Sequence, residues 1–232
     1  MSFNIDLEKN LSIVISDQQK KQFEIYFEFL IEYNKITNLT RITEVDEVYY
    51  KHFYDSLTMA STVNMNEIQT LCDMGSGAGF PSIPLKIIYP HLHITIVDSL
   101  NKRIIFLQKL IDKLEIDKVD LVHDRVEQYA LTHQEQFDIV TARALGNLSL
   151  ISEMGIPMTK IKGKFIALKG INYESELDES LNGIKILGGK VQDIVKYDLP
   201  YDYGTRYHIV INKNKHVKGY PRHFSIMSKK PL

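Results

Sequence analysis

The stretch Leu71-Cys72-Asp73-Met74-Gly75-Ser76-Gly77-Ala78-Gly79-Phe80-Pro81 decides the fold class of this chain. An apolar run, residues 68–74, leads into glycines at alternate positions, and an amphipathic run begins at Pro81. We interpret this order as a buried strand, a tight turn and the N-terminus of a helix. Glycine lets a backbone approach a ligand closely, and the free N–H groups of a first helical turn attract anionic groups.

A carboxylate follows the next predicted strand. A second apolar run, residues 93–97, ends in Asp98, roughly twenty residues after the glycine turn, the usual spacing in nucleotide-binding units. An acidic residue at this place commonly accepts hydrogen bonds from the two hydroxyls of a ribose. The two runs and the turn between them therefore predict a nucleoside-binding βαβ unit.

The spacing of the glycines limits the class of ligand that the turn could bind. A dinucleotide fingerprint has its last glycine three positions after the second, whereas Gly79 falls two positions after Gly77 and Phe80 occupies the dinucleotide position. A dehydrogenase is therefore the weakest option. The pattern Asp-x-Gly-x-Gly-x-Gly resembles the first motif of class I methyltransferases, which bind S-adenosyl-L-methionine. The alternative, that the glycines only make a turn, is disfavoured by the acidic residue at the end of each strand.

Composition excludes several other classes of protein. Of the 232 residues, 44% are hydrophobic and 25% are charged, which is typical of an ordered globular protein. Cys72 is the only cysteine, so neither a disulfide framework nor a zinc cluster can form. Residues 1–10 lack a signal-peptide core, and no apolar run reaches the length of a membrane span. We therefore expect a soluble, cytoplasmic protein that binds no metal. We also expect it to be a monomer.

The alternation of patterns predicts an α/β fold with a helical N-terminal extension, residues 1–64, before an S-adenosylmethionine-binding domain, residues 65–232. In the extension, a capping box at Ser16 and Gln19 opens a helix over residues 18–33, whose aromatic stripe we assign to the core. A second helix is expected over residues 45–61. The domain should be a class I, Rossmann-like, mostly parallel seven-stranded sheet with helices on both faces. Its predicted strands are 68–74, 93–98, 119–123, 137–142, 163–169, 190–197 and 206–212, and its predicted helices are 81–89, 101–114, 125–131, 147–159 and 173–187.

Ligands of such sheets bind at the carboxyl ends of the strands, where the strand order reverses. This rule places Asp73, Asp98 and the turns 123–127 and 141–143 around one crevice.

A different feature, the C-terminal tail, suggests a second kind of ligand. Residues 212–232 carry six lysines and arginines and no acidic residue, as expected of a phosphate-contacting surface. The alternative is a solvated basic end.

Several short stretches match one family. The chain resembles the bacterial RsmG methyltransferases, also called glucose-inhibited division protein B, which methylate guanine N7 in small-subunit ribosomal RNA. Two departures are Ser225 and Met227, where the family tail usually has a glycine and a proline, and the unusual pair at 123–124. The matching stretches, in the family's order, are Tyr33–Thr40, Lys51–Leu57, Asp73–Pro84, Asp98–Arg103, Arg125–Glu127, Phe137–Asp138, Ala142–Ala144, Gly163–Gly170, Tyr220–Arg222 and Lys230–Leu232.

The resemblance implies an S-adenosyl-L-methionine-dependent enzyme that acts on guanosine 527 of 16S rRNA, as free RNA or in the small ribosomal subunit. The glycine and strand-end pattern, the basic tail and the resemblance together predict roles for two sets of residues. The cofactor-binding set is Asp73, Gly75, Gly77, Gly79, Phe80, Asp98, Val126, Glu127 and Arg143. The RNA-binding set is Lys169, Lys213, Lys218, Arg222, Lys229 and Lys230.

Some of these assignments have alternatives. Asp73 could instead be a helix N-cap, and Glu127 a first-turn acid favoured by the helix dipole. Arg143 is the candidate for positioning and could contact the cofactor, guanine O6 or a phosphate, or form a surface salt bridge. Lys169 could be a solvated side chain. His52 and Asp55, three apart on a predicted helix, are expected to form a hydrogen-bonded pair packed on the cofactor domain, not a metal site.

The expected chemistry needs no general base, because guanine N7 carries a free lone pair and no proton at neutral pH. Direct in-line transfer can then depend on positioning and electrostatics. Two other hypotheses remain open from the sequence. One is a class I methyltransferase that acts on a small molecule or protein, and the other is an RNA-binding module that has lost catalysis.

Overall fold

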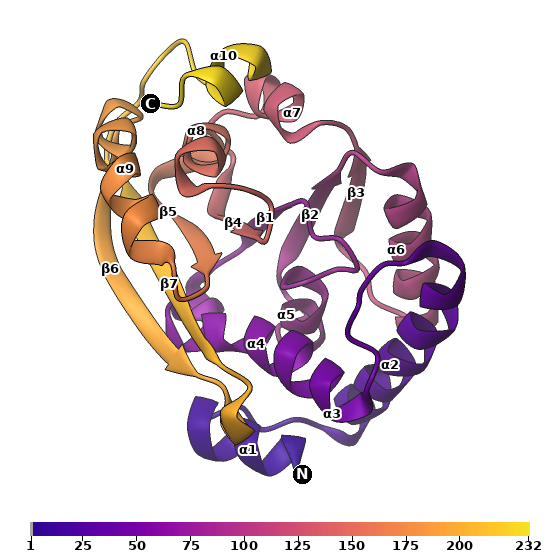
Figure 1. Ribbon diagram of the computed structural model, residues 1–232. Coiled ribbons are helices and arrows are strands. Elements are labelled where there is room, and N and C mark those ends of the chain that lie inside the picture. The colour runs from indigo at the N-terminus through magenta and orange to yellow at the C-terminus, as the bar shows by residue number, and fades with distance from the viewer. Residues whose placement is uncertain (1) are drawn as a thin grey trace.

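The computed structural model describes residues 2–232 and is built on one seven-stranded sheet in the order β3-β2-β1-β4-β5-β7-β6 (Figure 1). Neighbouring strands are parallel except for β7, which is antiparallel to both β5 and β6. The predicted α/β class with a mostly parallel sheet is confirmed. The strands are β1 (Thr70–Met74), β2 (His93–Asp98), β3 (Val119–His123), β4 (Phe137–Arg143), β5 (Thr159–Lys169), β6 (Gly189–Asp198) and β7 (Thr205–Lys213).

The strand order reverses at β1, which has β2 on one side and β4 on the other. In the register of the sheet, Asp73 lies opposite Ile96 of β2 and Thr141 of β4. The ends of these strands, near Asp98 and Arg143, therefore lie beside the glycine turn. This is the edge at which open α/β sheets bind their ligands.

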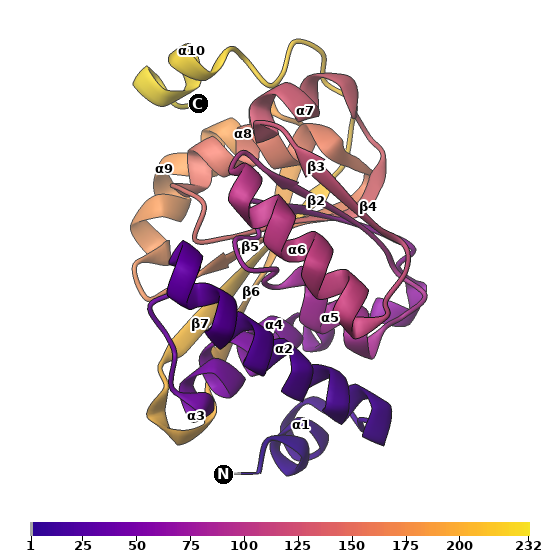
Figure 2. The same ribbon diagram turned by 90° about the vertical axis from the view of Figure 1, so that its right-hand side faces the viewer.

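Helices cover both faces of the sheet, each over its own hydrophobic core (Figures 1 and 2). One core joins α1, α2, α5 and α6, and includes Phe3, Tyr26, Ile83 and Phe106. The other lies under α7, α8, α9 and α10. The helices are α1 (Phe3–Leu11), α2 (Asp17–Thr37), α3 (Val45–Val48), α4 (Asp55–Leu57), α5 (Ser82–Ile88), α6 (Asn101–Leu114), α7 (Val126–Thr132), α8 (Leu148–Met158), α9 (Tyr173–Ile186) and α10 (Phe224–Lys229).

Helix α2 forms as its sequence predicts. The Ser16 hydroxyl accepts a hydrogen bond from the Gln19 backbone, and the Gln19 side chain accepts one from the Ser16 backbone, which completes the capping box. Phe23 and Tyr26 are buried, so the aromatic stripe does belong to the core. None of the helices in residues 2–232 is long and apolar enough to cross a membrane.

Other expectations need correction. The helix expected over residues 45–61 is interrupted after α3 by a π-helical turn, Tyr49–Tyr54, and ends in a 3₁₀ turn. A π-turn has one residue more in each hydrogen-bonded turn than an α-turn, so the apolar spacing that predicts an α-helix does not predict it. Helices α1 and α10 were not predicted from the sequence, because both are short and lie close to the chain ends. Strand β5 begins at Thr159, four residues before the predicted start.

Candidate active site

The glycine turn after β1 has the backbone geometry that its sequence predicts. Gly75, Gly77 and Gly79 all have positive φ, at 69°, 62° and 100°. The Gly75 N–H donates to the Val97 carbonyl at 2.8 Å, which ties the turn to β2. A Cβ atom on Gly79 would lie 2.8 Å from the side chain of Ile83. The turn is therefore held close to both its neighbouring strand and the helix that follows it.

Asp98 joins this turn to the end of β2. Its carboxylate is 2% exposed and accepts hydrogen bonds from the Leu100 backbone at 2.9 Å and the Gly77 backbone at 3.3 Å. Arg103 Nη1 lies 3.1 Å from Asp98 Oδ2. The carboxylate is thus fixed next to the glycine turn by three donors.

Four residues of the predicted cofactor-binding set line one cavity of about 220 Å³: Gly75, Asp98, Val126 and Glu127. Glu127 is buried and forms an ion pair with the Arg125 side chain. The cavity is completed by apolar side chains from α8 and by Phe224 of α10. The other lining residues are Val97, Ser99, Arg103, Arg125, Leu145, Leu150, Met154 and Phe224.

Asp73 lies behind the turn and does not line that cavity. Its carboxylate is fully buried, and burial raises its pKa to about 7. Oδ2 accepts a hydrogen bond at 3.3 Å from the backbone N–H of Ser82, the first residue of α5, and Oδ1 has no hydrogen-bond partner among the described residues. Asp73 is therefore not the N-cap residue of α5, which is Pro81, but its carboxylate accepts from the first N–H of that helix.

Arg143 turns toward the N-terminal segment. Its Nη1 lies 2.9 Å from Asp55 Oδ2, and its Nη2 donates to His52 Nδ1 at 3.2 Å. The guanidinium also lies over the Phe80 ring, 5.0 Å from its centroid. Phe80, the residue after the glycine turn, stacks on His52 with ring centroids 4.4 Å apart. Arg143 is therefore partly buried and pairs with a buried carboxylate, not with an exposed one on the surface.

His52 is neutral in this cluster. Burial and the Arg143 charge lower its pKa to about 3. Since Nδ1 accepts from Arg143, the proton lies on Nε2, which is 2.9 Å from Thr40 Oγ1. The sequence analysis paired His52 with Asp55, whereas the structure joins each of them to Arg143. The match of residues 51–57 to the family was the signal that could have placed them in the site.

A second cavity, of about 560 Å³, lies on the Arg143 side. Arg206, which the sequence analysis did not select, lines it, and its Nε lies 3.4 Å from Asp55 Oδ1. Lys169 Nζ lies 2.7 Å from Glu176 and donates to the Gly146 carbonyl at 2.7 Å, so it is an anchored side chain and not a freely solvated one. The other lining residues are Ile42, Lys51, His52, Asp55, Arg143, Ala144, Gly146, Leu168, Gly170 and Glu176.

The turn after β4 borders both cavities. Leu145 lines the first cavity, and its neighbours Ala144 and Gly146 line the second. This arrangement brings the glycine turn and Asp98 to one side of the turn, and Arg143 with its partners to the other.

In the basic tail, two residues of the predicted RNA-binding set, Lys213 and Arg222, contact other parts of the protein. Lys213 is buried at the end of β7, where burial lowers its pKa, so its ammonium is not part of an exposed surface. Arg222 Nε and Nη2 lie 2.7 and 2.6 Å from the two carboxylate oxygens of Glu153, which is 1% exposed. Arg222 therefore anchors the tail to α8. Lys218, Lys229 and Lys230 are exposed.

The tail around the two departures from the family pattern is helical. Ser225 and Met227 lie in α10, and Met227 is fully buried in the core beneath it. The His223 side chain accepts a hydrogen bond from the Ser225 backbone at the start of this helix. The apolar side chain of Met227 thus holds the tail against the core that α8 covers.

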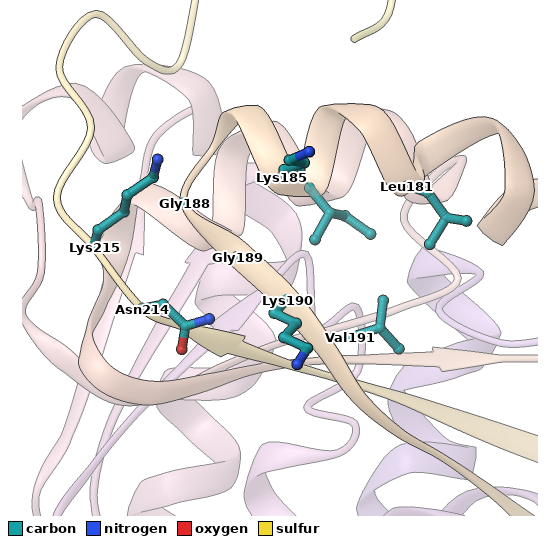
Figure 3. Close-up of a pocket in the computed structure, with 9 residues that line it drawn as sticks. Leu181, Lys185, Gly188, Gly189, Lys190, Val191, Asn214 and Lys215 are labelled. Carbon is teal, nitrogen blue, oxygen red and sulfur yellow. The ribbon is translucent and has the colours of Figure 1, made fainter.

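A third cavity lies away from this site, between α9 and the start of β6 (Figure 3). Leu181 and Val191 line it, and Lys185, Lys190 and Lys215 stand around it. None of the predicted site residues lines it. In residues 2–232, no group of three or more His, Cys, Asp and Glu side chains could hold a metal ion.

This chain is similar to known proteins in sequence and in fold. A family model for rRNA small subunit methyltransferase G, GidB, matches residues 19–202. The ribosomal RNA small subunit methyltransferase G of Staphylococcus saprophyticus is 51% identical over 222 residues, 95% of this chain and 93% of that protein. The protein of the same name from Bacillus subtilis is 47% identical over 228 residues, 97% of this chain and 95% of that protein.

Among solved structures, M. jannaschii TYW2 in complex with AdoMet aligns with a TM-score of 0.56 at 16% identity, over 72% of this chain and 76% of that one. The ribosomal protein L11 methylase of Lactobacillus delbrueckii aligns with a TM-score of 0.54 at 14% identity, over 71% and 79%. These two likenesses concern the fold. The family match and the relatives show that this chain belongs to the rRNA small subunit methyltransferase G family.

Proposed function

We propose that this chain transfers the methyl group of S-adenosyl-L-methionine to N7 of a guanosine in 16S rRNA, the position corresponding to guanosine 527 of the family. The observation that carries the proposal is the pair of cavities that residues 144–146 border. One is lined by the glycine turn and Asp98, and the other by Arg143 and its partners. The relatives named for small-subunit rRNA methylation support the substrate class.

The first cavity suits the cofactor. Asp98 has its carboxylate at the end of β2, where it can accept hydrogen bonds from ribose hydroxyls. The turn around Gly75 leaves room for the methionine end, and Val126 and Glu127 border the place of the adenine. Apolar side chains such as Met154 supply the wall for the base. When bound, S-adenosyl-L-methionine would supply a methyl group on a sulfonium for an in-line displacement, with the thioether S-adenosylhomocysteine as the leaving group.

The second cavity positions the guanosine, and no residue there has to remove a proton. His52 is neutral, and both of its ring nitrogens are engaged by Arg143 and Thr40. Arg143 can donate to guanine O6 or to a phosphate. It cannot donate to N7 during the reaction, because that bond would occupy the reactive lone pair. Positioning and electrostatic stabilisation then account for the acceleration.

The RNA extends beyond the cavity onto the tail. Lys218, Lys229 and Lys230 are exposed and can contact phosphates, whereas Lys213 and Arg222 serve the packing of the tail. A base inside structured RNA has to leave its stack to enter the cavity. The site of action is the cytoplasm, where a small ribosomal subunit is the acceptor.

The test uses S-adenosyl-L-methionine labelled in its methyl group, with small subunits from cells that lack this protein as the acceptor. The RNA is then digested and the labelled nucleoside identified and mapped. Label in N7-methylguanosine at one site supports the proposal, and the Asp98→Ala variant should lose it. Label in another nucleoside contradicts the N7 assignment. Cofactor binding without label in the RNA favours a small molecule or protein as the substrate, and RNA binding without cofactor binding favours an inactive RNA-binding module.

A further inference from the structure

Helix α2 reaches the glycine turn through a single hydroxyl group. Tyr26 Oη donates a hydrogen bond to the backbone carbonyl of Ala78 at 2.5 Å, across 52 positions of sequence. The Tyr26 side chain is fully buried, and its ring stacks on Phe80 with centroids 5.5 Å apart and planes 12° apart. The tyrosine therefore contacts both the middle of the turn and the residue that follows it.

The turn is shaped to receive this hydroxyl. Ala78 is buried, and its carbonyl would cost free energy if it were left without a donor. A Cβ atom on Gly79 would lie 2.8 Å from Tyr26 Oη, so only glycine leaves the space that the hydroxyl occupies. The third glycine of the motif is thus matched to a residue on another helix, in addition to its φ of 100°.

The same contact supports the second cavity. Phe80 lies between two nearly parallel rings, those of Tyr26 and His52, at interplanar angles of 12° and 15°. The Arg143 guanidinium lies over Phe80 as well. Fixing the backbone of residues 78–80 therefore fixes two things. It sets the shape of the glycine turn, and it sets the position of the Phe80 ring that Arg143 packs on.

We propose that Tyr26 is a positioning residue of the cofactor site, whose hydroxyl fixes the Ala78–Gly79 peptide so that the glycine turn is preorganised for S-adenosyl-L-methionine. Tyr26 does not line the cofactor cavity, so it acts only through the turn. This inference rests on the proposed function. It makes α2, which lies outside the βαβ unit, a determinant of cofactor affinity.

The test is the Tyr26→Phe variant of the full chain, which keeps the ring and its stacking and removes one hydroxyl. Tyr50→Phe is the matched control, because Tyr50 is also buried and its hydroxyl donates to Asp6 Oδ2 at 2.5 Å. Both variants should lower Tm by several degrees, since each removes a hydrogen bond donated by a buried tyrosine. Only Tyr26→Phe should weaken S-adenosyl-L-methionine binding, with a Kd raised on the order of tenfold, as loss of one hydrogen bond implies.

Calorimetry with S-adenosyl-L-methionine measures Kd, and initial rates at saturating small subunit give kcat and KM for the cofactor. We expect a raised KM for Tyr26→Phe, with kcat recovered at saturating cofactor. Hydrogen exchange at the Gly79 and Phe80 amides, which donate to the Ser76 carbonyl at 3.0 Å each, should be faster in Tyr26→Phe than in Tyr50→Phe. Equal Kd values for the two variants, or unchanged exchange at these amides, overturn the inference. Failure of the wild-type chain to bind the cofactor contradicts the proposed function instead.

Discussion

Asp55 Oδ2 and Arg143 Nη1 lie 2.9 Å apart, although 88 positions separate the two residues in the sequence. The Asp55 carboxylate is 4% exposed and also lies 3.4 Å from Arg206 Nε. One buried acid from the N-terminal segment therefore holds two guanidinium groups at the wall of the second cavity. The backbone at the end of β4 does not by itself orient the Arg143 side chain; the ion pair with Asp55 does.

Replacement of that acid tests its role. Asp55→Asn keeps the shape and removes the charge, so two partly buried guanidinium groups lose their counterion. We expect the free energy of unfolding to fall by about 3 kcal/mol. Methyl transfer should fall more than tenfold, while cofactor affinity stays within about twofold. Denaturation in urea, calorimetry and single-turnover rates measure these effects. Asp112→Asn, on the exposed side of α6, is the control, and an unchanged rate in Asp55→Asn would contradict the assignment.

Asp98→Ala tests the ribose contact. The substitution removes a charged acceptor at the mouth of the cofactor cavity, and hydrogen bonds to charged groups contribute roughly 1.5–3 kcal/mol. We therefore expect the Kd for S-adenosyl-L-methionine to rise by about tenfold or more in calorimetry. Asp120→Ala is the matched control, because Asp120 lies on the neighbouring strand and is exposed. An unchanged Kd would remove Asp98 from the ribose.

Arg222→Ala should act on stability. Without the guanidinium, the Glu153 carboxylate stays buried without its counterion, at a cost of about 3 kcal/mol in the free energy of unfolding. The double variant Arg222→Ala/Glu153→Gln should recover part of this loss, because the two side chains interact directly. Urea denaturation of the four proteins in this cycle gives the coupling. Weaker RNA binding with an unchanged free energy of unfolding would instead restore Arg222 as a phosphate contact.

The third glycine of the turn should not tolerate a methyl group. Gly79→Ala requires a residue with a side chain at φ of 100° and places its Cβ 2.8 Å from Tyr26 Oη. We expect a loss of about 2 kcal/mol in the free energy of unfolding, together with weaker cofactor binding. Gly170→Ala is the control, since an added Cβ meets nothing within 4 Å there. Equal behaviour of the two variants would show that the turn adapts.

His208 predicts a dependence of stability on pH. Burial lowers its pKa from 6.5 to about 3 in the folded protein, so only the unfolded chain binds the proton between these values. The free energy of unfolding should therefore decrease as the pH falls below about 6.5, by about 1 kcal/mol per pH unit from this group. His208→Gln keeps polar atoms near Thr58 and Thr62 and should remove that slope. Urea denaturation at several pH values checks this, and parallel curves for the two proteins would contradict it.

Two other groups contribute to the same pH profile. His52 acts in the same direction as His208, because its pKa is also lowered to about 3. Asp73 acts in the opposite direction, since its folded pKa is raised to about 7 and the stability linked to its protonated form is lost as the pH rises from about 4 to 7. Comparison of His208→Gln with the wild type isolates His208, because both other groups are present in each protein.

The sequence by itself determined the features that depend on neighbouring residues. The glycines at alternate positions, the apolar run before them and Asp98 after the next run predict the strand, turn and ligand edge, because backbone freedom and apolar periodicity are local properties. The capping box at Ser16 predicts the start of α2 for the same reason. These signals were sufficient for the α/β class and for the edge of the sheet at which Gly75 and Asp98 line a cavity.

Only the tertiary structure decided which charges are free and which are paired. Lys213 and Arg222 look alike in a basic tail, yet one is buried in the sheet and the other pairs with Glu153, 69 positions away. The bonds of Arg143 to Asp55 and of Tyr26 to Ala78 also join distant elements. Composition and spacing do not record such partners, because a charge or a hydroxyl acquires its role from the elements that pack around it and exclude water.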